Sequence, residues 1–125
     1  MTRILLAEDE QAMREYLARA LERSGYEVVS VDRGTEAAPL LESQHFDLLL
    51  TDIVMPEMDG IELARHCSKV SPHTEVMFIT GFSGVALRAG ESMPNAKILS
   101  KPFHLKDLVL EVERLFAKES FGELK

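Results

Sequence analysis

Short apolar runs alternate with amphipathic segments along the whole chain, and this alternation limits the folds that the sequence can adopt. The runs comprise residues 4–7, 28–31, 48–50, 76–79 and 98–99. All but the last are almost continuously apolar, which is typical of strands covered on both faces. We therefore expect five strands separated by helices, with the first four covered on both faces.

Helical periods lie between these runs. The first stripe ends at Gly25, a residue suited to a left-handed helix cap, and a weaker stripe begins after Asp59-Gly60. The stripes consist of Met13, Tyr16, Leu17, Ala20 and Leu21, then Ile61, Ala64 and Cys67, then Leu105, Leu108, Val109, Val112, Leu115 and Phe116. Each stripe gives its helix one apolar face for packing against the sheet.

Two helices are less clearly defined by the sequence. The helix expected over residues 35–43 contains Pro39, which indicates either a late start or a kink. Residues 81–95 are interrupted by glycines and a proline, so we expect only one short helix there, over residues 85–89. Strands that alternate with helices imply a doubly wound α/β fold, in which right-handed crossovers place helices on both faces of a parallel sheet.

The length of 125 residues suits one domain, which we place at residues 1–118, with a C-terminal tail at 119–125 and fraying from Lys118. The net charge of −7 argues against nucleic acid or an anionic membrane as a partner. No signal peptide or membrane-length apolar stretch is present, so we expect a cytoplasmic protein.

Metal sites built from sulfur or imidazole are not expected. Cys67 is the only cysteine, and we expect it to be a small buried side chain rather than a partner in a disulfide or a thiolate cage. The four histidines are scattered along the chain without the close helical pairing of a zinc site.

Polar side chains follow four of the five apolar runs. They are Glu8, Asp9 and Glu10 after the first, Thr51 and Asp52 after the third, Thr80 after the fourth, and Ser100 and Lys101 after the fifth. Ligands of open α/β sheets bind beyond the carboxyl ends of the strands, where these side chains should gather. Packed carboxylates repel one another, so such a gathering is not explained by stability.

These residues suit phosphoryl chemistry. Glu8, Asp9 and Asp52 supply hard oxygen ligands of the kind that Mg²⁺ prefers. Lys101 offers a positive charge and Thr80 a hydroxyl group for phosphoryl oxygens. Asp52 ends the central strand and is the best candidate for a carboxylate nucleophile that forms an aspartyl phosphate.

Each residue also has an ordinary structural interpretation. Glu8 or Asp9 alone would most often cap a helix, Thr80 would be a turn hydroxyl, and Lys101 a solvated surface charge. Asp52 is harder to explain in this way, because a carboxylate that ends an apolar strand needs a partner. The convergence of four strand ends favours the functional interpretation.

The stretches 4–10, 50–60, 78–81 and 100–103 resemble those of response regulator receiver domains, in the same order. The resemblance covers residues 2 to about 117 and implies a flavodoxin-like (CheY-like) fold, with five parallel strands in the order 2-1-3-4-5. It also implies that a histidine kinase or a histidine phosphotransfer protein supplies the phosphoryl group.

The resemblance assigns roles residue by residue. Asp52 would accept the phosphoryl group, and Mg²⁺ would be bound by Glu8, Asp9, Asp52 and the main-chain carbonyl of Val54. Thr80 would be the switch hydroxyl. Lys101 would bind phosphate and be joined to Pro102 by a cis peptide bond. Many receivers have an aromatic residue where this chain has Ile98.

The resemblance is greatest to a group of stand-alone alphaproteobacterial receivers, which belong to a cell-cycle phosphorelay. In their unphosphorylated form they bind the unfoldase of the Clp protease and help to deliver substrates. It therefore implies a phosphorylation-controlled binding module rather than an enzyme, either a Clp adaptor or a phosphate shuttle in a phosphorelay.

The competing function is a magnesium-dependent phosphatase with Asp52 as nucleophile. Such enzymes usually place a second acid two residues after the nucleophile, and Val54 occupies that position. A receiver-like protein that binds partners without being phosphorylated would not need the acids, Thr80 and Lys101. Both alternatives are therefore weaker than the phosphorylated receiver.

Overall fold

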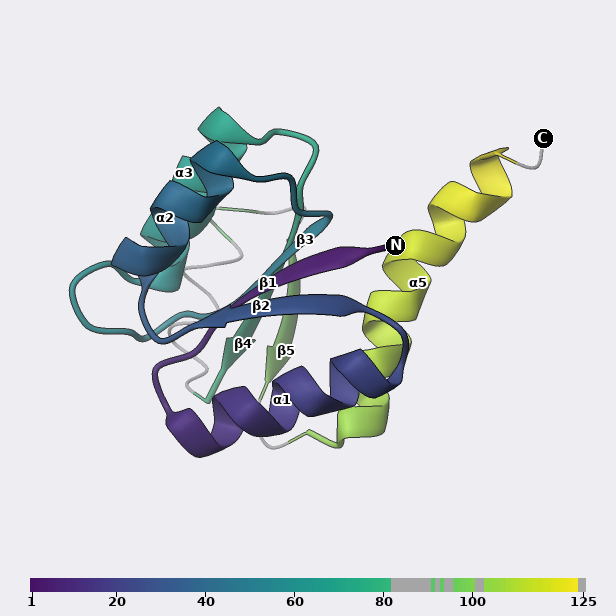
Figure 1. Ribbon diagram of the computed structural model, residues 1–125, viewed down its shortest axis with the longest axis horizontal. Coiled ribbons are helices and arrows are strands. Elements are labelled where there is room, and N and C mark those ends of the chain that lie inside the picture. Colours follow the sequence, from purple (N-terminus) through teal and green to yellow (C-terminus); the bar gives the residue numbers. More distant parts are fainter. Residues whose placement is uncertain (82–90, 92, 94–95, 101–102, 124–125) are drawn as a thin grey trace.

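The computed structural model describes residues 1–81, 91, 93, 96–100 and 103–123, which form a five-stranded parallel sheet with helices on both faces (Figure 1). The strands are β1 (Arg3–Ala7), β2 (Glu27–Val31), β3 (Leu48–Asp52), β4 (Glu75–Thr80) and β5 (Lys97–Ser100). The helices are α1 (Gln11–Arg23), α2 (Gly34–Ser43), α3 (Gly60–Val70) and α5 (Leu105–Glu123). The sheet order β2-β1-β3-β4-β5 confirms the expected doubly wound, flavodoxin-like fold.

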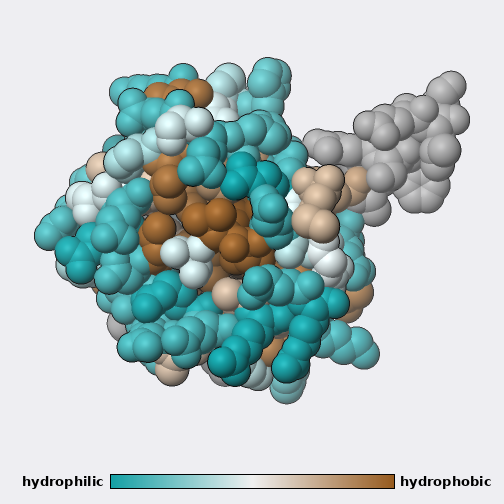
Figure 2. Space-filling model, viewed as in Figure 1, coloured by the Kyte–Doolittle hydropathy of each residue, from teal (hydrophilic) through white to brown (hydrophobic). Residues whose placement is uncertain are grey.

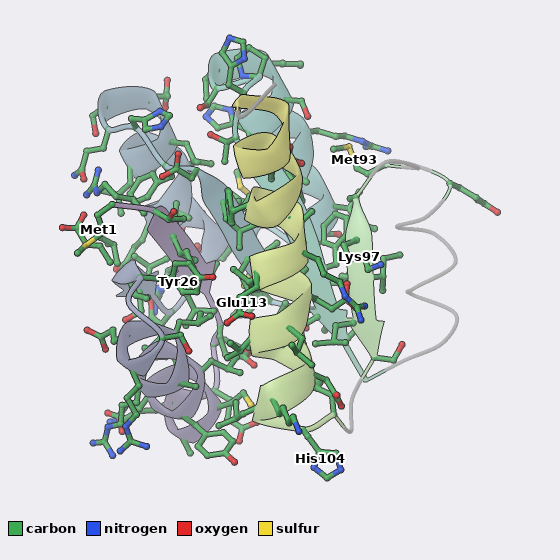
Figure 3. The ribbon with its side chains drawn as sticks, turned by 90° about the vertical axis from the view of Figure 1, so that its right-hand side faces the viewer. Met1, Tyr26, Met93, Lys97, His104 and Glu113 are labelled. Carbon is green, nitrogen blue, oxygen red and sulfur yellow. The ribbon has the colours of Figure 1, made fainter. Side chains whose placement is uncertain are left out.

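Alternate residues of the central strands point to opposite faces of the sheet, and each face has its own hydrophobic core. One core joins Leu5, Leu49 and Phe78 to side chains of α2 and α3. The other joins strand residues such as Leu6 and Leu50 to α1 and α5. Figure 3 shows α5 crossing the second face between α1 and β5.

β3 is the most deeply buried strand, since all five of its residues are buried between β1 and β4. The expectation that β2 is covered on both faces was wrong. β2 is an edge strand, and Val28, Val29 and Val31 are only half-buried. Hydrophobic surface is visible in Figure 2 where β2 crosses the same view in Figure 1.

α2 begins at Gly34, so Pro39 lies inside it and the late start is excluded. A proline in a helix leaves a carbonyl without its usual N–H donor. The expected helix over residues 85–89 lies outside the described residues. No helix in the described part of the chain is long and apolar enough to cross a membrane.

α5 continues to Glu123, beyond the expected start of the tail at residue 119. α5 therefore includes residues 119–123, which we expected to lie in the tail. Ala117, Lys118 and Glu119 have high helix propensity, which explains the continuation.

Arg3 connects three segments at the amino-terminal end of the sheet. Its guanidinium pairs with Glu27 of β2, donates to the carbonyl of His45 at 2.8 Å and to Gln44 Oε1 at 2.9 Å, and lies 4.7 Å from the centre of the Phe46 ring. β1, β2 and the connection from α2 to β3 are thereby joined at the end opposite to the carboxyl ends of the strands.

Candidate functional site

Three acidic side chains converge at the carboxyl ends of β1 and β3. Ala7 pairs with Thr51 across these two strands, which brings the residues that follow, Glu8 and Asp52, to the same level. One carboxylate oxygen from each of Glu8, Asp9 and Asp52 lies within 4.8 Å of the other two. The sequence prediction that these three acids gather at one edge agrees with this geometry.

The burial of this acidic cluster (Glu8, Asp9 and Asp52) indicates what it can bind. Glu8 and Asp52 are buried, whereas Asp9 is exposed. Three carboxylates this close repel one another unless positive charge compensates them. An exclusively oxygen donor set, open to water on the Asp9 side, fits Mg²⁺, which keeps several water ligands.

Thr80 lies at the same edge of the sheet. It ends β4, is almost fully buried, and directly follows Ile79, which pairs with Asp52 of β3. Across β4 and β5, Thr80 pairs with Ser100. Lys101 and Pro102 come next in the chain, but they lie outside the described residues, as does the peptide bond between them. The structure thus places Thr80 close to the cluster along the sheet edge and describes no position for Lys101.

The loop that follows Asp52 contains Val54, the expected source of a main-chain ligand. Its first residue, Ile53, is held on both sides: its N–H donates to Ile79 O at 3.2 Å, and its carbonyl accepts from Gly60 N at 2.8 Å. The Val54 side chain is half exposed. Met55 is buried, with its sulfur 3.9 Å from Thr51 Oγ1.

The same loop contains a strained turn. Met58 N donates to Pro56 O at 2.8 Å, and the residue between them, Glu57, has φ 68°. This is the rare γ-turn with a positive central φ, which is unfavourable for a residue other than glycine. Beyond the proline, no residue of this segment indicates such a turn, because glutamate is not typical of this conformation.

Gly60 allows α3 to begin directly against the acidic cluster. A Cβ atom at this position would lie 2.2 Å from the carbonyl oxygen of Asp52, so only glycine fits without movement of the backbone. Asp59 caps the same helix by accepting from Glu62 N at 2.9 Å. The Asp59-Gly60 pair therefore fixes the start of α3 relative to Asp52.

Arg14 is a further residue at this edge that the sequence did not reveal. Its Nη1 donates to the carbonyl of Glu8 at 2.9 Å, while Glu8 N donates to Val31 O at 3.1 Å. The backbone of Glu8 is thus fixed from both sides. An arginine in the first turn of an amphipathic helix is usually a solvated charge, so its residue type alone did not indicate this contact.

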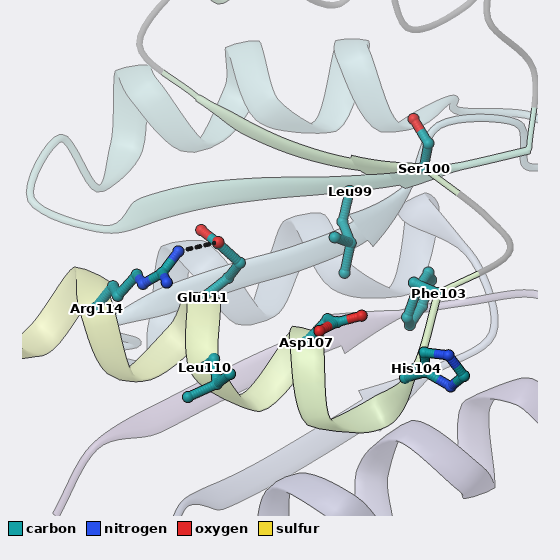
Figure 4. Close-up of a pocket in the computed structure, with 8 residues that line it drawn as sticks. All are labelled: Leu99, Ser100, Phe103, His104, Asp107, Leu110, Glu111 and Arg114. Carbon is teal, nitrogen blue, oxygen red and sulfur yellow. Dashed lines mark hydrogen bonds and ion pairs between the residues drawn. The ribbon is translucent and has the colours of Figure 1, made fainter.

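A separate pocket of about 540 Å³ lies between β5 and α5 (Figure 4). It is lined by Leu99, Ser100, Phe103, His104, Asp107, Leu110, Glu111 and Arg114. Glu111 bonds to Arg114 Nη1 at 2.8 Å and to Lys97 Nζ at 3.1 Å. The pocket shares no residue with the acidic cluster and has mixed apolar and charged walls.

Cys67 is fully buried in α3, which confirms the expectation for this residue. Burial raises the pKa of its thiol to about 11, and a hydrogen bond with Thr74 opposes that rise. In the described part of the chain, the acidic cluster is the one grouping of three or more His, Cys, Asp or Glu side chains suited to a metal ion.

Comparisons with known proteins give one consistent result. Residues 4–113 match the profile of the family described as response regulator receiver domain. The chain is 56% identical to the response regulator receiver protein CpdR of Brucella abortus (strain 2308) over 116 residues, 92% of this chain and 97% of that protein.

Two solved structures agree with this result. A CheY-like receiver domain protein of Methanospirillum hungatei JF-1 is 26% identical and superposes with a TM-score of 0.88 over 98% of both chains. The response regulator TrrA of Thermotoga maritima, solved in complex with Mg²⁺-BeF, is 30% identical. Its TM-score is 0.82 over 92% of this chain and 99% of that chain.

Proposed function

The chain belongs to the response regulator receiver family and is closely related to CpdR, and we propose that phosphorylation of Asp52 controls its binding to a partner protein. One observation carries this proposal: the carboxylate of Asp52, at the end of the most buried strand, lies within 4.8 Å of those of Glu8 and Asp9. A histidine kinase or a histidine phosphotransfer protein would donate the phosphoryl group.

In the proposed reaction, a carboxylate oxygen of Asp52 attacks the phosphorus atom of a phosphohistidine. A P–O bond forms, the P–N bond breaks, and the imidazole nitrogen leaves with its electron pair. Glu8, Asp9, Asp52 and the Val54 carbonyl would hold Mg²⁺, which offsets the negative charge of the carboxylates and the phosphoryl oxygens. The buried hydroxyl of Thr80 and the ammonium of Lys101 would bind the remaining phosphoryl oxygens.

We do not assign this chain as an enzyme that turns over an external substrate. A phosphatase needs a general acid for the leaving group, and the position two residues after Asp52 is the half-exposed Val54. The chain would promote only its own phosphorylation and dephosphorylation, in the cytoplasm where its kinases act.

Labelling with acetyl phosphate tests the role of Asp52. We expect intact-protein mass spectrometry to show one added phosphoryl group in the presence of Mg²⁺ and none in EDTA. Asp52→Asn should remain unlabelled, whereas Asp47→Asn, just before the amino-terminal end of the same strand, should be labelled like the wild type. Full labelling of Asp52→Asn would show that the acceptor has been assigned wrongly.

The relation to CpdR also supports a specific partner. By the resemblance given above, we propose that the unphosphorylated form binds the unfoldase of the Clp protease and that phosphorylation releases it. A signal of this kind requires the partner to prefer one conformer by about 1–3 kcal/mol, the usual range of coupling free energies.

A binding titration with the Clp unfoldase tests this partner, with and without beryllofluoride and Mg²⁺. We expect about a 5- to 150-fold weaker interaction in the beryllofluoride state, which is that free energy range expressed as affinity. Asp52→Asn should bind equally in both conditions. Tighter binding with beryllofluoride would reverse the proposed sign, and no binding in either state would exclude this partner.

A further inference from the structure

The loop between β3 and α3 is held by the start of α2, a helix that contributes no residue to the acidic cluster. Thr35 Oγ1 donates to Glu57 Oε2 at 3.2 Å, and Glu57 is the central residue of the γ-turn described above. The preceding residue, Gly34, is buried against Met58. Figure 1 shows this loop passing beside the first turn of α2.

Gly34 makes the closer of the two contacts. A Cβ atom at this position would lie 2.7 Å from the carbonyl oxygen of Met58 and 3.1 Å from its Cβ. A backbone oxygen cannot move away as the end of a flexible side chain can, so any larger residue would displace the loop or the helix. Gly34 therefore sets how closely α2 and the loop approach each other.

The strain in the loop gives this contact a consequence. A non-glycine residue with positive φ is retained only where the surrounding structure enforces it. Ile53 and Gly60 fix the two ends of the loop, and Met55 is held by its own burial. Glu57 and Met58 lie between these fixed points. The start of α2 contacts both of them, and Met58 also packs against the core between the sheet and the helices α2 and α3.

We propose that Gly34 and Thr35 are positioning residues that, through Glu57 and Met58, hold the β3–α3 loop in the conformation that presents the Val54 carbonyl to Mg²⁺. This inference rests on the proposed function, because the Val54 carbonyl is a proposed ligand. It extends the site to a second layer of residues on a helix that begins after β2. Neither residue touches the metal or the phosphoryl group.

Magnesium affinity of the unphosphorylated protein, measured by isothermal titration calorimetry, tests the inference. Gly34→Ala and Thr35→Val should each weaken Mg²⁺ binding by about three- to tenfold, the range for loss of one such interaction. Thr35→Ser keeps the hydroxyl and should restore affinity. Ser43→Ala removes a hydroxyl from the far end of α2, where it bonds only Pro39 O at 3.0 Å, and should bind Mg²⁺ like the wild type.

Thermal denaturation in EDTA separates positioning from general damage to the fold. Gly34→Ala introduces the close contact with Met58 O and should lower the melting temperature, whereas Thr35→Val should leave it unchanged while it weakens Mg²⁺ binding. If Gly34→Ala fails to fold, Thr35→Val alone decides, because Thr35 is exposed.

Three outcomes would contradict the inference. Wild-type affinity in both variants would overturn it, as would equal weakening in Ser43→Ala or no restoration by Thr35→Ser. If the wild type is labelled on Asp52 and binds Mg²⁺, and the two variants bind Mg²⁺ with the same affinity, this inference alone is overturned. A wild-type chain that neither labels nor binds Mg²⁺ would overturn the proposed function, and this inference with it.

Discussion

Neutralising Asp52 should stabilise the metal-free protein, because the acidic cluster is a source of repulsion. Two unit charges 4.8 Å apart repel by about 3 kcal/mol at an effective dielectric constant of 20. Asp9 is exposed, and solvent weakens its share. Asn at position 52 keeps the shape of the side chain and one acceptor oxygen. We therefore expect Asp52→Asn to raise the free energy of unfolding in EDTA by about 1–3 kcal/mol.

Magnesium should narrow the difference in the free energy of unfolding between the two proteins. A cation that binds only the folded state stabilises it by about 1.4 kcal/mol when its concentration is tenfold above the dissociation constant. The wild type should gain this stabilisation, whereas Asp52→Asn has lost one proposed ligand and should gain little. Added salt should reduce the difference seen in EDTA, since it screens the repulsion.

The measurement is urea denaturation followed by far-ultraviolet circular dichroism, in EDTA and in excess Mg²⁺. Asp107→Asn is the control, because Asp107 is an exposed residue of α5 outside the acidic cluster. The reasoning fails if Asp52→Asn is no more stable than the wild type in EDTA, or if Mg²⁺ stabilises both proteins equally.

Three further changes test the start and the packing of α3. Gly60→Ala would place a Cβ atom 2.2 Å from Asp52 O, so it should lower the free energy of unfolding by about 2 kcal/mol and slow acetyl phosphate labelling. Asp59→Ala removes the cap of α3 and should lower the free energy of unfolding, measured by urea denaturation, by about 1 kcal/mol. Asp59→Asn keeps an acceptor oxygen for Glu62 N and should retain most of the wild-type stability. Burial raises the pKa of the Cys67 thiol from 9.0 to about 11, so the folded protein holds this proton more tightly than the unfolded chain does. The resulting stability is fully present at pH values below the unfolded pKa of 9.0. That contribution, about 3 kcal/mol, should be lost between pH 9 and pH 11 in the wild type and be absent from the pH dependence of Cys67→Ala.

The sequence was sufficient for the parts of the fold that follow from local patterns. Continuous apolar runs placed all five strands to within two residues at either end, and the acids and Thr80 were found where strands end. The strand order came from the family resemblance, because apolar runs alone do not indicate which strand lies at an edge. For the same reason the half-buried state of β2 was missed.

The contacts between segments distant in the chain could not be predicted. Gly34 precedes the helix expected over residues 35–43, and its packing against Met58 depends on how two connections meet in space. Glu57 has no residue-type signal for a positive φ, because the surrounding structure imposes it. The contact of Arg14 with the Glu8 carbonyl was missed for the same reason.

The arginine contacts at the amino-terminal end of the sheet have a practical consequence for attaching labels to this protein. Met1 is 91% exposed, so a tag or fluorophore joined to the chain there projects into solvent. Two residues later, Arg3 ties the same end of the chain to β2 and to the segment before β3. A fusion that preserves residues from Thr2 onward should therefore report on binding at the carboxyl ends of the strands without disturbing them. One that replaces Arg3 would loosen the register of the edge strand.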